Sequence, residues 1–297
     1  MRVVFLGNHT VGVRVLQAMS EMADVAGVVA HPPDPEDGVV YESVFDFAGM
    51  HGWNAIRGKG RDSETLDFVK AAKPDLLWIT DYRYLIPREM LRTAPLGTVN
   101  LHPSLLPAYR GRASINWAIL QGETTLGLTA HFVDEGMDTG DIIEQASYKI
   151  REDQDVGDCL KILYPLYTSM TRAVLTRFQS GKVPRVPQDH SRATVFPARR
   201  PEDGKIDWNQ PARSIVNLVR AVAAPYPGAF TSIDGNKMFI WKARVISEEG
   251  SQSLPGCVLA REGTEFHVQC GAGLVALTRV EFSDSNQRLE IGCRLGD

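Results

Sequence analysis

The first half of the chain alternates between short apolar runs and stretches with helical spacing. Val3–Leu6 and Val25–Ala30 are such runs, and their length and composition are typical of strands buried on both faces of a sheet. We expect strands at residues 3–6, 25–30, 75–79, 98–101, 129–133 and 141–150, and helices around residues 11–19, 44–50, 66–72 and 156–178. Ser63 is a candidate N-cap of the third helix. Strands that alternate with helices predict a Rossmann-like, doubly wound parallel α/β sheet with its site at the carboxyl ends of the strands.

The composition changes after residue 180. Gly181, Pro184, Pro187, Pro197 and Pro201 punctuate this region, which predicts an extended linker over the surface. A helix around 212–222 and five short strands at 229–233, 238–246, 257–260, 265–270 and 274–282 follow, separated by turn residues. This rhythm is typical of a small, OB-like β-barrel. For 297 residues we expect an α/β domain at 1–183, a linker at 184–204 and a small β-barrel domain at 205–297.

Charge and composition exclude several classes of protein. Lys and Arg total 32 against 36 Asp and Glu, and this net charge of -4 disfavours a large nucleic-acid-binding face. No apolar run approaches the ~20 residues of a membrane span, and the first run is too short for a secretion signal. The four cysteines are widely spaced without a CxxC pair, so we expect neither a zinc site nor a disulfide framework, and a cytoplasmic location fits.

The segment from Gly7 to Gly12 has the two-glycine spacing of a phosphate loop. No Lys-Ser/Thr pair follows Gly12, and the GxGxxG pattern of dinucleotide binding is missing. A tight turn into a helix is the favoured interpretation. Phosphate binding at the helix N-terminus stays open.

Three polar residues with complementary chemistry lie in the segment from Asn100 to Asp138. Asn100 and His102 are two apart on a predicted strand that Pro103 ends, so both point to one face at its carboxyl end. An amide donor, an imidazole and a carboxylate suit acyl transfer, although loop hydrogen bonding and an ordinary turn also explain these residues. No GxSxG motif or paired metal ligands compete, and His131 is expected to be a buried strand histidine.

These residues and their neighbours resemble the folate-dependent formyltransferase superfamily. The family's SLLP motif stands intact at Ser104–Pro107, and residues 203–208 and 220–230 resemble the start of its C-terminal domain. The resemblance implies that Asn100, His102 and Asp138 are a catalytic triad and that 10-formyltetrahydrofolate is the donor, with no metal. In this mechanism, Asn100 and a protonated His102 stabilise the oxyanion. One departure is Ser114, where relatives usually carry proline.

The resemblance also suggests which residues contact the two substrates. The expected folate-binding residues are Ser104, Leu105, Leu106, Pro107, Tyr82, Arg83, Leu85, Ile86, Asp134 and Gly136. The expected contacts to the acceptor are Asn8, Tyr41, Arg110, Gly111, Arg112, Arg199 and Arg200. Guanidinium groups suit a diphosphate because they bind it bidentately, although a solvated surface role is open for each arginine.

The acceptor is expected to be a nucleotide-linked amino sugar, with methionyl-tRNA as the alternative. Residues 205–297 carry ten basic and ten acidic residues, whereas a domain that grips tRNA should be basic. The loop His31–Gly38 is net acidic, and it resembles the UDP-4-amino-4-deoxy-L-arabinose formyltransferase type that serves lipopolysaccharide or glycan biosynthesis. The nucleotide and the position of the amine are not determined by the sequence.

Two further classes are open at this stage. In a hydrolase of the same superfamily, water would replace the amine, but those enzymes usually carry a regulatory domain ahead of a first strand that begins here at Arg2. A non-catalytic binding module is disfavoured because the three triad residues are all present. Homodimerisation is also left open.

Overall fold

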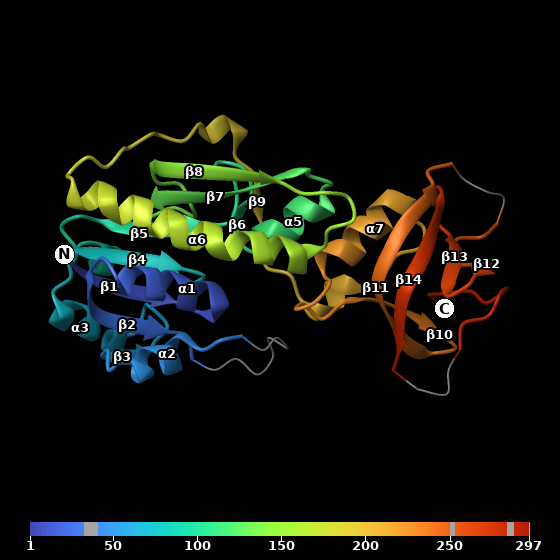
Figure 1. Ribbon diagram of the computed structural model, residues 1–297, viewed down its shortest axis with the longest axis horizontal. Helices are drawn as coiled ribbons and strands as arrows, with labels where there is room; N and C mark the ends of the chain where they lie inside the picture. The colour runs from blue at the N-terminus through green and yellow to red at the C-terminus, as the bar shows by residue number, and fades with distance from the viewer. Residues whose placement is uncertain (33–40, 250–252, 284–287, 297) are drawn as a thin grey trace. The chain divides into compact units, whose positions relative to one another are not determined.

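The computed structural model describes residues 1–32, 41–249, 253–283 and 288–296 (Figure 1). The chain forms two compact units. The first comprises residues 1–114, 126–148 and 161–196, and the second comprises residues 115–125, 149–160 and 197–297. The domain boundaries predicted at residues 183 and 204 stay a prediction.

A seven-stranded sheet forms the centre of the first unit, in the order β3-β2-β1-β4-β5-β7-β8. Its strands are β1 (Arg2–Gly7), β2 (Asp24–Ala30), β3 (Ala55–Arg57), β4 (Leu76–Thr80), β5 (Thr98–His102), β7 (Thr125–Phe132) and β8 (Ile142–Lys149). The strands from β3 to β5 pair in parallel, and β7 runs antiparallel to β5. The α/β class predicted from the apolar runs is confirmed.

Helices pack on both faces of this sheet. They are α1 (His9–Ser20), α2 (Val44–Met50), α3 (Ser63–Ala72), α4 (Arg88–Leu91) and α6 (Val156–Gln179). Helix α5 (Ser114–Leu120) belongs almost entirely to the second unit. Val4, Leu77 and Met90 are fully buried in a core where α3 and α4 meet the sheet. In Figure 1, α6 runs beside α1, and a salt bridge of 2.8 Å joins Arg172 to Glu21 at the end of α1.

The N-cap of α3 is Asp62, so the prediction of Ser63 is wrong by one residue. The Asp62 carboxylate accepts hydrogen bonds from the Thr65 backbone N–H at 2.7 Å and from the Thr65 hydroxyl at 2.6 Å. Ser63 is the first residue with helical backbone geometry, so it follows the N-cap position and does not occupy it.

The two glycines of the Gly7–Gly12 segment are explained by close packing. A Cβ atom on Gly7 would lie 2.8 Å from the Thr80 carbonyl oxygen, and one on Gly12 would lie 2.8 Å from a methyl group of Val44. At these distances neither position has room for a side chain. Close packing therefore explains the two glycines, in agreement with the tight turn that the sequence predicts.

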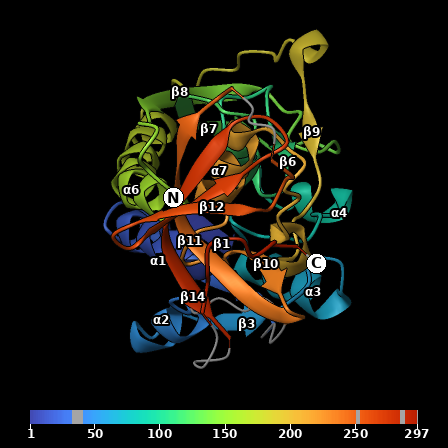
Figure 2. The ribbon, with the colours of Figure 1, turned by 90° about the vertical axis from the view of Figure 1, so that its right-hand side faces the viewer.

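The second unit contains a five-stranded antiparallel sheet in the order β10-β11-β14-β13-β12. Its elements are α7 (Ala212–Ala221), β10 (Ala229–Ile233), β11 (Asn236–Ser247), β12 (Val258–Glu262), β13 (Glu265–Gln269) and β14 (Leu274–Phe282). Figure 2 looks onto these strands with α7 behind them. The five strands predicted for the small C-terminal β domain are therefore present as one antiparallel sheet.

Part of the expected linker is an ordered strap on the first unit. Val186 forms an antiparallel bridge to Ile142, and β9 (Val195–Phe196) pairs in parallel with β6 (Arg110–Gly111). A short 3-10 helix, η1 (His190–Arg192), lies between them, and a second one, η2 (Pro201–Gly204), follows β9. This strap brings residues 186–196 against the loop that follows the SLLP motif.

Candidate active site

The candidate site lies at the carboxyl end of β5. Asn100 and His102 point to the same side of the strand because they are two residues apart. The antiparallel pairing of β7 places His131 directly opposite Asn100. Asp138 enters from the turn after β7 with a left-handed backbone φ of 53°, a conformation that favours a short polar residue.

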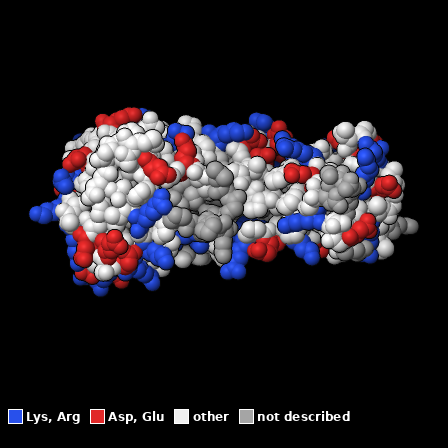
Figure 3. All heavy atoms as spheres, turned by 90° about the horizontal axis from the view of Figure 1, so that it is seen from below, with Lys and Arg blue, Asp and Glu red and all other residues white. Residues whose placement is uncertain are grey.

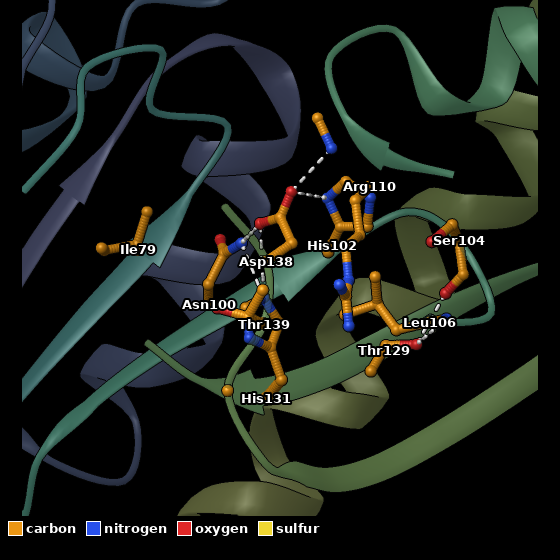
Figure 4. Close-up of polar contacts among 12 residues, drawn as sticks. Ile79, Asn100, His102, Ser104, Leu106, Arg110, Thr129, His131, Asp138 and Thr139 are labelled. Atoms are coloured by element: carbon orange, nitrogen blue, oxygen red, sulfur yellow. Dashed lines mark hydrogen bonds and ion pairs between the residues drawn. The ribbon is translucent and has the colours of Figure 1, made fainter. Parts of the chain in front are cut away.

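The structure brings the three predicted catalytic residues together around one carboxylate (Figure 4). The His102 Nδ1 atom lies 3.7 Å from Asp138 Oδ2, and the Asn100 amide nitrogen lies 3.5 Å from Asp138 Oδ1. His102 is 5% exposed, so water is largely excluded from its ring. An amide donor, a buried imidazole and a carboxylate thus share a single site.

The surroundings of His102 favour the neutral form of its ring. Burial lowers the pKa of His102 below its usual value, and the attraction of the Asp138 carboxylate opposes this only in part. Its Nε2 atom lies 2.7 Å from the Tyr109 carbonyl oxygen, which can only accept, so Nε2 carries the proton. The lone pair is therefore on Nδ1, beside Asp138. In the mechanism expected from the resemblance His102 is protonated when it stabilises the oxyanion, whereas burial favours the neutral ring before the reaction; its role stays a prediction.

Asp138 is ionised at neutral pH. Its burial acts to raise the pKa, but the ring of His102, which is charged in acid, together with the ring of His131 and the Gly111 backbone N–H, holds the pKa of Asp138 well below its usual range. The Gly111 N–H donates to Asp138 Oδ2 at 2.8 Å. A fixed negative charge beside Nδ1 of His102 stabilises an imidazolium once a proton arrives there.

His131 belongs to the same cluster, which the sequence did not indicate. Its Nδ1 atom donates to the Phe132 carbonyl oxygen at 2.7 Å, so Nε2 is left as an acceptor for the Asn100 amide at 3.1 Å. The ring is 1% exposed, as expected for a buried strand histidine. Only the register between β5 and β7 reveals that it orients Asn100.

Side chains from β7 and β8 hold the backbone of the SLLP loop by hydrogen bonds. The Thr129 hydroxyl donates to the Ser104 carbonyl oxygen at 2.6 Å and accepts from the Leu106 N–H at 3.2 Å. Gln145 donates to the Leu106 carbonyl oxygen at 2.9 Å. Ser104 and Leu106 are buried, whereas Leu105 and Pro107 are partly exposed. The loop therefore follows His102 with a rigid backbone.

A second polar cluster lies at the carboxyl ends of β1, β2 and β4. His31 contacts the amide of Asn8 at 2.9 Å and accepts from the Arg83 backbone N–H at 3.0 Å. The rings of Tyr41 and His9 are in contact, tilted by 34° with centroids 3.8 Å apart. The expected acceptor residues Asn8 and Tyr41 thus lie close to Arg83, which was expected to bind folate.

The remaining predicted folate contacts come from two loops. Tyr82 donates from its hydroxyl to the Gly58 carbonyl oxygen at 2.8 Å, while Leu85 is 53% exposed after β4 and Ile86 is half-buried. Asp134 accepts from the Gly136 N–H at 3.0 Å in the turn that leads to Asp138. These roles stay predictions.

The predicted arginines have different environments. Arg110 is 5% exposed, and its guanidinium is held by Gln188 and His190, so the solvated surface role that was left open for each arginine does not apply to it. Arg112 is exposed beside Gly111. Arg199 and Arg200 belong to the second unit, where Arg199 donates to the Asp203 carbonyl oxygen at 2.7 Å. Contact of these residues with an acceptor stays a prediction.

The described part of the chain contains no group of three or more His, Cys, Asp or Glu side chains placed to hold a metal ion. The cysteines are all free thiols. Among the same residues, none of the helices has both the length and the apolar character to span a bilayer.

Comparison with models of known protein families shows to which family the chain belongs. A model of the formyl transferase family matches residues 1–163, and a model of the formyl transferase C-terminal domain matches residues 199–288. The chain belongs to the formyl transferase family. The superfamily resemblance noted in the sequence is therefore confirmed.

Two curated relatives of this formyl transferase are similar along nearly its whole length. A methionyl-tRNA formyltransferase of Acetivibrio thermocellus is 35% identical over 296 residues, which cover 98% of this chain and 94% of that protein. A methionyl-tRNA formyltransferase of Ruminiclostridium cellulolyticum is 33% identical over 297 residues, covering 98% and 95%. Among solved structures, the sugar 3N-formyl transferase WlaRD, crystallised with dTDP and 5-N-formyl-THF, shares the fold with a TM-score of 0.71, at 18% identity over 96% of this chain and 98% of that chain.

These relatives correct the expected acceptor of this formyl transferase. The prediction of a nucleotide-linked amino sugar is wrong, because both curated relatives are methionyl-tRNA formyltransferases. The prediction relied on net charge, which averages over a domain, whereas phosphate binding depends on local groups of cations. Basic and acidic side chains are interspersed on the face in Figure 3. Of the acidic loop His31–Gly38, residues 33–38 lie outside the described residues.

Proposed function

We propose that this formyl transferase moves the formyl group of 10-formyltetrahydrofolate to the amine of methionyl-tRNA. The observation that carries this proposal is the 35% identity to a methionyl-tRNA formyltransferase over 98% of the chain. The arrangement of Asn100, His102 and Asp138 supports the chemistry. A cytoplasmic location is part of the proposal and agrees with four free thiols.

His102 acts as the general base in this mechanism. The neutral amine attacks the formyl carbon, and a new C–N bond forms while the carbonyl oxygen becomes an oxyanion. Nδ1 of His102 takes the proton that the amine loses, and the resulting imidazolium is stabilised by the ionised Asp138 at 3.7 Å. Because that ion pair forms only as the reaction proceeds, it favours the transition state over the ground state.

Asn100 supplies a donor for the oxyanion. Its amide nitrogen bonds to His131 at 3.1 Å, but its contact to Asp138 is 3.5 Å, at the limit of a hydrogen bond. The second N–H is therefore available to the developing negative charge. Collapse of the intermediate breaks the bond from carbon to N10 of the folate, and N10 receives the proton from His102.

The folate is proposed to lie along the SLLP loop. Ser104–Pro107 follows His102 directly, and Thr129 and Gln145 hold its backbone. Leu85, an apolar side chain that is 53% exposed, would cover part of the ligand together with Ile86 and Tyr82. The turn Asp134–Gly136 leads into Asp138 and would lie on the other side of the reacting group.

The proposal is tested by offering the purified chain 10-formyltetrahydrofolate with methionyl-tRNA or with nucleotide-linked 3-amino and 4-amino sugars. We expect formylated methionyl-tRNA and an equal amount of tetrahydrofolate. His102→Ala should lower kcat by about 10²–10⁴-fold. Turnover of an amino sugar without turnover of the tRNA would contradict the acceptor. Release of formate without any amine would contradict transfer altogether.

A further inference from the structure

The loop 109–111 contacts both members of the imidazole–carboxylate pair. The Tyr109 carbonyl oxygen accepts from Nε2 of His102 at 2.7 Å, and the Gly111 N–H donates to Asp138 at 2.8 Å. The position of this loop therefore determines how far Nδ1 of His102 lies from Asp138. Whatever holds residue 110 between them controls the geometry of the pair.

Gln188 connects this loop to the turn that carries Asp138. Its side-chain oxygen accepts from Arg110 Nη2 at 2.6 Å and Nε at 3.2 Å. Its side-chain nitrogen donates to the carbonyl oxygens of Asp138 at 2.9 Å and Gly140 at 2.7 Å. Four hydrogen bonds thus use one amide that is 6% exposed. The amide therefore links the side chain of Arg110 to the backbone of the turn at Asp138, 28 residues further along the chain.

The strap that carries Gln188 is itself fastened at both ends. Val186 pairs with Ile142 ahead of it, and Thr194 accepts from the backbone N–H groups of Tyr109 and Arg110 beyond it. Phe196 stacks on Tyr109 with planes 14° apart. The start of the strap is held apart from the loop, because Val186 pairs with Ile142, whereas its far end is fastened to the loop itself.

Arg110 has an unusual environment for a buried cation. In the described part of the chain its guanidinium bonds only to the neutral Gln188 amide and to His190, at 3.1 Å for the latter. A buried guanidinium without a carboxylate partner is costly unless its hydrogen bonds are well placed. An arrangement of this kind suits a positional task better than simple stability.

We propose that Gln188, acting through Arg110, is a positioning residue that sets the separation of His102 and Asp138 during formyl transfer. The inference rests on the roles proposed above for His102 and Asp138. Gln188 and Arg110 together form a brace, and neither of them touches the reacting atoms. Loss of the brace would let Asp138 move away from Nδ1 of His102, and the imidazolium formed in the reaction would lose its counterion.

The test uses Gln188→Leu and the isosteric Gln188→Glu, which still accepts from Arg110 but cannot donate to the two carbonyl oxygens. We expect kcat for tetrahydrofolate release to fall about 10- to 100-fold, with KM for both substrates within about threefold of wild type. Gln179→Leu is the matched control, because Gln179 is exposed and also donates to a backbone carbonyl, that of Met22 at 2.8 Å. An unchanged kcat for folded Gln188→Glu would overturn the proposal, even if Gln188→Leu failed to fold.

Titration of the His102 imidazole by NMR gives a readout that does not depend on the acceptor. A brace that positions Asp138 predicts a lower His102 pKa in Gln188→Leu, which adds no charge of its own, because the Asp138 carboxylate moves away. An unchanged or raised value would overturn the positioning role. Should His102→Ala keep its activity, the proposed mechanism fails, whereas the NMR comparison still decides what Gln188 does.

Discussion

Single residues in this protein depend strongly on how burial changes their protonation. His102 and His31 are both buried histidines, and desolvation lowers the pKa of each ring. For His102 the consequence is chemical, since a neutral ring can accept the proton of an amine at pH 7. For His31 the consequence is a dependence of folding stability on pH.

His31 should make the protein less stable as the solution becomes acidic. Burial, reinforced by Arg83, lowers the pKa of His31 to about 3 from its usual value near 6.5. Between these two values the unfolded chain binds a proton that the folded chain excludes. The contribution of His31 is thus fully present above pH 6.5 and is lost towards pH 3, by about 1.4 kcal/mol per pH unit.

Urea unfolding between pH 7 and pH 4 checks this prediction. His31→Gln should flatten the fall in the free energy of unfolding by about 1.4 kcal/mol per pH unit relative to wild type. Parallel curves for the two proteins would show that His31 is not the group that titrates.

At the scale of elements, helix α3 shows how a cap is decided by backbone geometry. Asp62 and Ser63 are adjacent, and both are residue types that cap helices. Only Asp62 has the extended backbone of an N-cap, with φ of -77° and ψ of 151°. Its second carboxylate oxygen also accepts from the Lys59 N–H at 2.7 Å.

Asp62→Ala should therefore lower the free energy of unfolding by about 1 kcal/mol, within a usual range of about 0.5–2 kcal/mol. Ser63→Ala is the matched control, and its effect should stay within about 0.5 kcal/mol because the Ser63 side chain is outside the cap. Thermal or urea unfolding measures both variants. A larger loss for Ser63→Ala would reverse the assignment of the cap.

At the scale of the whole molecule, the charge of the chain bears on the proposed binding of methionyl-tRNA. The chain carries a net charge of -4, and residues 205–297 are balanced between basic and acidic residues. If methionyl-tRNA is the acceptor, as proposed, a chain with this net charge is expected to neutralise few phosphates unless cations gather locally, and base, ribose and aminoacyl contacts would then supply much of the affinity.

The salt dependence of the reaction measures this directly. KM for methionyl-tRNA should rise with salt concentration with a log–log slope of about 2 or less, because each neutralised phosphate contributes about 0.7–0.9. KM for 10-formyltetrahydrofolate, measured in the same buffers, is the control for general effects of salt. A slope of about 5 or more would show an extensive phosphate-binding surface that net charge conceals.

The α/β class, the five C-terminal strands and the position of Asn100 and His102 on one side of a strand could all be predicted from the amino-acid pattern. These features depend on hydrophobic periodicity and on Pro103, which act over a few neighbouring residues. The tertiary structure decided what surrounds them. His131 faces Asn100 from 31 residues away, and Gln188 reaches Arg110 from 78 residues away. Such contacts exist only once strands align in register and a strap closes over a loop, and desolvation of His102 follows from the same packing. For that reason the protonation state of the base and its brace could not be derived from local pattern.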